Sequence, residues 1–116
     1  ADVVRLAEFY CGSFAISVGP SENVESPTIV GAQAANELLN IIGIKASFVL
    51  TEYNDKIYIS SRSIDEINVQ IIMEKLGGGG HLNVAGAQLT GVTIVQAKRM
   101  IQDTLDEMLK EGDIEE

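Results

Sequence analysis

Residues 46–61, ASFVLTEYNDKIYISS, are the stretch that decides the fold. Two runs rich in β-branched and aromatic residues, 46–53 and 56–61, flank the dipeptide Asn54-Asp55. Such a spacing is typical of a β-hairpin, because Asn and Asp tolerate the backbone angles of a two-residue turn. Apolar and polar residues alternate in the second run, which predicts that one face of this strand is buried.

Helices and further strands flank this hairpin. Ser26-Pro27 is a typical helix start, because serine caps the first turn and proline fits its first position. Before this helix we expect a helix from residue 2 to about residue 10 that ends near Gly12, a strand over 14–18 and a polar loop over 21–25. The helix that begins at Ser26-Pro27 should end at Ile42, with Gly43 as its stop. After the hairpin we expect a helix over 69–76 capped by Asn68, a strand over 82–89, a last helix after the capping box Thr93–Gln96, and a frayed tail after Gly112. This order predicts an α/β fold, with a mixed sheet of about four to five strands covered by helices in a single small domain.

The composition favours a packed domain and limits its chemistry. The chain has 116 residues, of which 46% are hydrophobic, and a formal net charge of −9. A basic surface for long nucleic acids is therefore not expected. The single cysteine, Cys11, excludes an internal disulfide, and we expect it to be a small packing residue. Because the chain opens on Ala1-Asp2 without a Met or a basic leader, we expect a domain excised from a longer protein.

The run Gly77-Gly78-Gly79-Gly80-His81 is the strongest candidate for chemistry. One glycine would suffice to end a helix, and four exceed that need. Glycines let backbone N–H groups approach an anion, and a histidine beside them can donate a hydrogen bond to phosphate. The run is neither a Walker loop nor a dinucleotide fingerprint, since no Lys-Ser/Thr follows it and it ends a helix.

Arg62 is the second candidate, flanked by Ser61 and Ser63 near the end of a predicted strand. A guanidinium can bind phosphate with two parallel hydrogen bonds, although a surface arginine in a turn is an equal alternative. Asn68 is expected to cap a helix, with a second role toward a ligand left open. One histidine and one cysteine argue against a metal site and against a nucleophilic triad within this chain.

Residues 61–82, SRSIDEINVQIIMEKLGGGGHL, resemble the DHH-associated C-terminal domain of the DHH phosphoesterase superfamily. More closely, they are similar to bacterial membrane-anchored cyclic-di-AMP phosphodiesterases. Residues 32–39, 46–49 and 91–94 fit the same domain, whereas residues 83–87, NVAGA, depart from the Thr-Asn-Ala-Ala-Thr common in those relatives. The resemblance implies that residues 1–12 end a linker helix from an upstream DHH domain, that 13–112 are the substrate-binding domain, and that 113–116 are an acidic tail.

The resemblance also implies a division of labour. The upstream DHH domain of the same chain would hold two divalent metals, usually manganese, that activate water. Arg62, Gly78, Gly79, Gly80 and His81 would contact phosphate and sugar. Ser61, Ser63 and Asn68 would support those contacts. The present chain would carry no catalytic or metal-binding residue and would be inactive alone.

The expected substrate is cyclic-di-AMP, hydrolysed to pApA by a bacterial membrane protein whose cytoplasmic part includes this domain. A short oligonucleotide is the other expected ligand; a homodimer is possible, and direct membrane contact is not expected. The alternatives are a nanoRNase- or exopolyphosphatase-like relative and a nucleic-acid-binding appendage without catalysis. The acidic charge and the scarcity of aromatic residues, 5% of the chain, disfavour the appendage.

Overall fold

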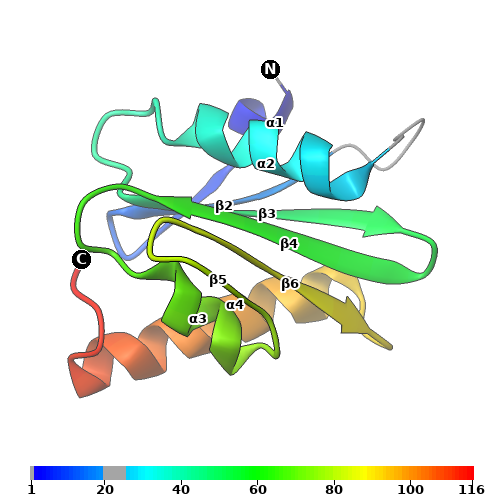
Figure 1. Cartoon of the computed structure of the whole chain (residues 1–116). Helices are drawn as coiled ribbons and strands as arrows, with labels where there is room; N and C mark the ends of the chain where they lie inside the picture. Colours follow the sequence, from blue (N-terminus) through cyan, green and yellow to red (C-terminus); the bar gives the residue numbers. More distant parts are fainter. Residues whose placement is uncertain (1, 20–25) are drawn as a thin grey trace.

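The computed structural model describes residues 2–19 and 26–116 and has a mixed sheet between two layers of helices (Figure 1). The elements are α1 (Asp2–Arg5), β1 (Glu8–Tyr10), β2 (Phe14–Val18), α2 (Pro27–Leu38), β3 (Ala46–Tyr53), β4 (Lys56–Ser63), α3 (Val69–Lys75), β5 (Gly79–Gly80), β6 (Val84–Thr90) and α4 (Ile94–Glu111). The strand order is β1-β2-β3-β4-β6-β5, with β2 and β3 parallel and the other neighbours antiparallel. The predicted α/β fold is confirmed, with six strands where four to five were expected.

The hairpin forms the middle of this sheet. β3 and β4 pair in full register from Ala46 opposite Ser63 to Tyr53 opposite Lys56. Asn54 and Asp55 take positive φ angles of 50° and 63°, as a tight hairpin turn requires. The predicted hairpin is confirmed, and β4 continues two residues beyond the expected end at Ser61, because Arg62 and Ser63 still pair with Ser47 and Ala46 of β3.

Alternating side chains of these strands build two cores. Those of Phe48, Leu50 and Ile59 pack on one face under α3 and α4. On the other face, Val49 packs against α1 and α2. Burying large aliphatic and aromatic side chains in this way stabilises the sheet by about 1.5–3 kcal/mol each. The helices in Figure 1 are thus divided between the two faces of the sheet, with α1 and α2 on one face and α3 and α4 on the other.

Three expectations at the ends of elements are wrong. The first helix ends at Arg5, and Glu8–Tyr10 forms strand β1 on the edge of β2. The helix α2 ends at Leu38 instead of residue 42, because the following residues tighten into turns that bury the side chain of Ile44. The residues after Gly112 do not fray, since Ile114 is only 6% exposed and packs in the core. In each case a tertiary contact overrides the local pattern.

The predicted helix caps are confirmed at the described residues. The side chains of Ser26, Asn68 and Thr93 each accept a hydrogen bond from the first turn of their helix, and Thr93 and Gln96 form a reciprocal capping box. The polar loop expected over 21–25 lies outside the described residues. Cys11 is partly buried against the core, as expected of a packing residue, but in a turn between two strands rather than at a helix end.

Tyr10 ties β1 to the last helix. Its hydroxyl donates a hydrogen bond of 2.6 Å to Asp106 Oδ1. This bond, followed by partial burial and by nearby negative charge, raises the pKa of Tyr10 from 10.0 to about 12. Because only the protonated hydroxyl donates, the contact stabilises the fold fully below pH 10 and is lost as the pH rises toward 12.

We therefore expect Tyr10→Phe to remove a tyrosine ionisation near pH 12 from an ultraviolet titration of the folded chain. The difference in unfolding free energy between the two proteins should shrink as the pH rises above 10. Tyr53→Phe is the matched control. A step near pH 12 that persists in Tyr10→Phe would show that Asp106 does not hold this hydroxyl.

Candidate functional site

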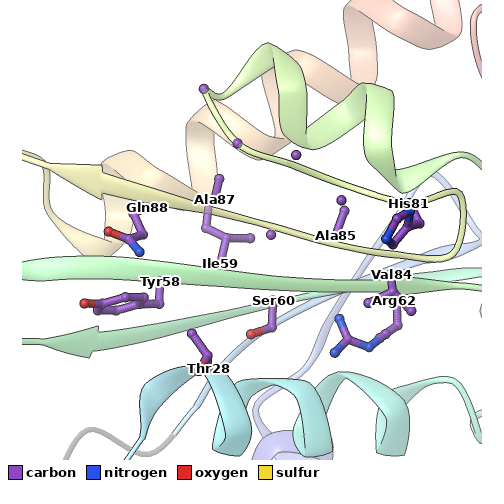
Figure 2. Close-up of a pocket in the computed structure, with 15 residues that line it drawn as sticks. Thr28, Tyr58, Ile59, Ser60, Arg62, His81, Val84, Ala85, Ala87 and Gln88 are labelled. Atoms are coloured by element: carbon purple, nitrogen blue, oxygen red, sulfur yellow. The ribbon is translucent and has the colours of Figure 1, made fainter.

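A cavity of about 610 Å³ opens between the glycine run, the face of β4 and β6, and the start of α2 (Figure 2). It is lined by Thr28, Tyr58, Ile59, Ser60, Arg62, Gly77, Gly78, Gly79, Gly80, His81, Val84, Ala85, Gly86, Ala87 and Gln88. Arg62 and His81 are the only groups among these residues that can carry positive charge, and none of the lining residues is acidic. On a chain of net charge −9, this gives a local site suited to an anion.

Arg62 reaches this cavity from β4. Its Nη1 donates a hydrogen bond of 2.8 Å to the carbonyl of the neighbouring Ser61. No described carboxylate lies within 4 Å of the guanidinium. Partial burial lowers the pKa of Arg62 below its ordinary value, and the group stays protonated at neutral pH. A half-buried cation without a carboxylate partner is ready to bind an anionic ligand.

The glycine run has fewer available backbone donors than its composition suggests. Gly77, with φ of 84°, ends α3, and the N–H groups of Gly77 and Gly78 donate to the carbonyls of Glu74 and Met73. The N–H of His81 donates to the carbonyl of Val84 at 2.7 Å and closes a turn. Gly79 and Gly80 form β5, which pairs antiparallel with β6. Because hydrogen-bonded pairs alternate along an antiparallel ladder, the bond between His81 and Val84 makes Gly79 and Gly86 the next bonded pair and leaves the N–H of Gly80 as the one candidate donor within this run.

The glycines also differ in how tightly the chain packs against them. A side chain at Gly78 would overlap the carbonyl oxygen of Gly86 and lie 2.7 Å from Cβ of Ala87. At Gly80, where φ is 149°, it would lie 2.5 Å from Cα of Ala85. At Gly79 it would meet nothing within 4 Å. Internal packing therefore explains Gly78 and Gly80, whereas the space beside Gly79 is open to a ligand.

The three supporting residues lie elsewhere. Because side chains alternate along β4, Ser61 and Ser63 point to the face opposite Arg62, where both are buried. The hydroxyl of Ser63 donates to the carbonyl of Ile67 at 2.6 Å and accepts from Asn83, and Asn68 caps α3. They hold the loop before α3 rather than line the cavity. Ser61 Oγ is buried and has no hydrogen-bond partner among the described residues.

Several lining residues were not singled out from the sequence. Tyr58 and Ser60 share the face of Arg62, four and two residues before it respectively, so the strand alternation could have found them. Gln88 and Gly86 lie opposite them on β6. The register between the two strands brings these residues together, and no local pattern specifies that register. Thr28 enters from the first turn of α2.

The described residues do not provide a metal centre. No three His, Cys, Asp or Glu side chains among residues 2–19 and 26–116 are grouped so as to hold an ion. A two-metal hydrolytic centre does not fit this part of the chain, and we derive no chemical step through one. In the same ranges, no helix is long and apolar enough to cross a membrane.

Comparison with known proteins gives the family. The chain is 47% identical over 105 residues to the cyclic-di-AMP phosphodiesterase PdeA of Listeria monocytogenes, covering 90% of this chain and 16% of that protein. It is 40% identical over 99 residues to the cyclic-di-AMP phosphodiesterase GdpP of Geobacillus thermodenitrificans, covering 84% of this chain and 15% of that protein. The chain thus spans about one sixth of the length of these relatives.

Solved structures share the fold at lower identity. An exopolyphosphatase-related protein of Bacteroides fragilis superposes with a TM-score of 0.79 at 21% identity, over 92% of this chain and 33% of that one. The C-Ala domain of Aquifex aeolicus alanyl-tRNA synthetase superposes with a TM-score of 0.64 at 20% identity, over 85% of this chain and 96% of that one. The resemblance read from residues 61–82 is confirmed by the PdeA and GdpP matches. Since the model of the DHHA1 domain matches residues 15–111, the chain belongs to the DHHA1 domain family.

Proposed function

We propose that this chain is the substrate-binding domain of a phosphodiesterase that hydrolyses cyclic-di-AMP to pApA. Relatives at 47% and 40% identity are named cyclic-di-AMP phosphodiesterases, and the cavity offers a compatible anion site. In this proposal the guanidinium of Arg62 and the imidazole of His81 bind a phosphate, which lies over the open side of Gly79.

One observation carries the proposal. Arg62 is half-buried, no described carboxylate pairs with it, and it shares a cavity without acids with the chain's one histidine. Partial burial of an unpaired cation is unfavourable unless an anion compensates for it. A ligand phosphate provides this compensation, and a short dinucleotide does so with few of the repulsive contacts that a long polyanion would make with an acidic protein.

The proposal assigns hydrolysis to the remainder of a longer protein. An upstream DHH domain would hold two divalent metals, with manganese the expected ion, and would close over the ligand bound here. We further propose that the longer protein is membrane-anchored in a bacterium and that this domain lies on its cytoplasmic side without touching the bilayer. A homodimer of the longer protein is compatible with this arrangement.

The test is a calorimetric titration of the 116-residue chain with cyclic-di-AMP, pApA, short RNA and polyphosphate. We expect the two adenine dinucleotides to bind more tightly than polyphosphate, and RNA affinity not to grow with length. Tight binding of long RNA alone would favour a nucleic-acid-binding appendage. Preference for polyphosphate would favour an exopolyphosphatase-like relative, and preference for short RNA would favour a nanoRNase.

The isolated chain should not hydrolyse any of these ligands. With manganese added, we expect chromatography to recover cyclic-di-AMP unchanged, because the described residues offer no metal centre. The longer protein, assayed in parallel, is the positive control. Turnover by the purified 116-residue chain would contradict the proposed division of labour.

A further inference from the structure

The cavity has two chemically different ends on one face of the sheet. Three pairs of residues lie directly opposite each other across β4 and β6: Arg62 with Val84, Ser60 with Gly86, and Tyr58 with Gln88. Figure 2 shows Tyr58 and Gln88 together at the end away from Arg62 and His81. Arg62 lies four positions after Tyr58, which corresponds to roughly 13 Å along β4.

Between the two ends of the cavity, the residues of β4 and β6 have small side chains or none. Gly86 has no side chain, and an added Cβ there would lie 2.7 Å from the carbonyl oxygen of Ile59. The Ser60 side chain opposite it is small and only 7% exposed, because Gly31 of α2 packs directly over it, so the open path between the two ends runs over the partly exposed Gly86. Nothing larger on this pair of strands separates the cationic end from the Tyr58 end. One elongated ligand can therefore contact both ends.

Tyr58 and Gln88 form a neutral end with unused binding groups. The ring of Tyr58 is held by an edge-to-face contact with Tyr53, with ring centroids 6.4 Å apart. Among the described residues, neither the Tyr58 hydroxyl nor the Gln88 amide has a hydrogen-bond partner, and neither residue is in a salt bridge. A positioned ring beside an unpaired amide suits a planar heterocycle.

The chemistry of the two side chains selects among heterocycles. Nucleobases stack on aromatic rings whatever their sequence, so Tyr58 supplies affinity without specificity. A glutamine amide offers a donor and an acceptor side by side, which matches the N6 amino group and N7 of adenine. Guanine presents two acceptors, O6 and N7, at the same positions, and would face the amide oxygen with a lone pair.

We infer that the Tyr58–Gln88 end of the cavity is a nucleobase subsite that prefers adenine to guanine, with the phosphate at Arg62 and His81. This inference rests on the proposed function, since it assumes that the phosphate end takes a nucleotide. It assigns affinity for the base to Tyr58 and the choice of base to Gln88.

The experiment measures the affinities of the 116-residue chain for pApA, pGpG and ribose 5-phosphate, in wild type and variants. We expect Tyr58→Ala to weaken both dinucleotides by roughly 5- to 150-fold and to leave ribose 5-phosphate unchanged. Gln88→Ala should weaken pApA alone and reduce the ratio of pApA to pGpG affinity by a similar factor. Thr90→Ala, on the same face of β6 but outside the cavity, is the matched control.

The outcomes separate this inference from the proposed function. If wild type binds pApA and Arg62→Ala weakens it while Tyr58→Ala and Gln88→Ala leave both dinucleotides unchanged, the base subsite is excluded and the phosphate site stands. If wild type does not bind pApA, both fail. Tyr58→Leu, which keeps apolar bulk without a ring, replaces Tyr58→Ala if circular dichroism shows that the alanine variant is unfolded.

Discussion

Replacing Arg62 with alanine should weaken binding of pApA by roughly 10- to 150-fold, which is about 1.5–3 kcal/mol for a hydrogen bond to a charged group. The reason is that Arg62 faces the cavity without a described carboxylate partner, so its loss leaves the ligand phosphate with the imidazole of His81 as its remaining side-chain partner. Calorimetry on the 116-residue chain and the Michaelis constant of the longer protein both report this effect.

The thermal stability of Arg62→Ala should not fall with its affinity for pApA. Arg62 is half-buried and burial lowers its pKa, so removing the charge should leave the unfolding midpoint unchanged or slightly raised. Arg99→Ala is the matched control, since Arg99 is exposed on α4 and pairs with Asp103 at 3.6 Å. Equal pApA affinity for wild type and Arg62→Ala would show that the arginine is a surface residue.

Alanine at Gly78 should lower the free energy of unfolding by on the order of 1–3 kcal/mol or more, because the new methyl group would overlap the carbonyl oxygen of Gly86. Neither backbone segment can move independently, because Gly86 pairs with Gly79 of β5 and the N–H of Gly78 donates to the carbonyl of Met73. In a thermal melt this corresponds to a midpoint lowered on the order of 5–15 °C. The effect does not depend on any ligand.

Gly79→Ala is the matched variant, one residue along the same run. Its methyl group would meet nothing within 4 Å, so the unfolding midpoint should stay close to that of wild type. The methyl group would instead occupy the open space beside the proposed phosphate, and pApA affinity should fall several-fold. Unchanged affinity in a folded Gly79→Ala would show that the ligand does not approach this backbone, while loss of stability there would contradict the packing described for β5.

Short sequence patterns correctly predicted the structural features that depend on neighbouring residues. The hairpin at Asn54-Asp55 and the helix starts at Ser26, Asn68 and Thr93 were confirmed because turns and caps depend on residues within a few positions of one another. The segment Glu8–Tyr10 was predicted as helix and is a strand, because its conformation depends on pairing with β2 and on the bond from Tyr10 to Asp106.

The sequence likewise predicted some features of the candidate site and missed others. Residue chemistry pointed to Arg62, His81 and the glycines, and the cavity does bring these groups together. Sequence proximity also suggested Ser61 and Ser63 as partners of Arg62. Neighbours on a strand point to opposite faces, so both serines are directed away from the cavity.

The sequence by itself determined the hairpin, the helix caps, the unusual run of glycines before His81 and the net charge of −9, because each depends on residue identity and short spacing. Tertiary structure decided which glycines are needed for packing and which one is open, and it placed Tyr58 opposite Gln88 at one end of the cavity. The pairing of β4 with β6 joins residues that are far apart in the sequence, from Arg62 with Val84 to Lys56 with Thr90. Burial of the two cores sets the register between these strands, and the sequence of one strand alone does not predict that register.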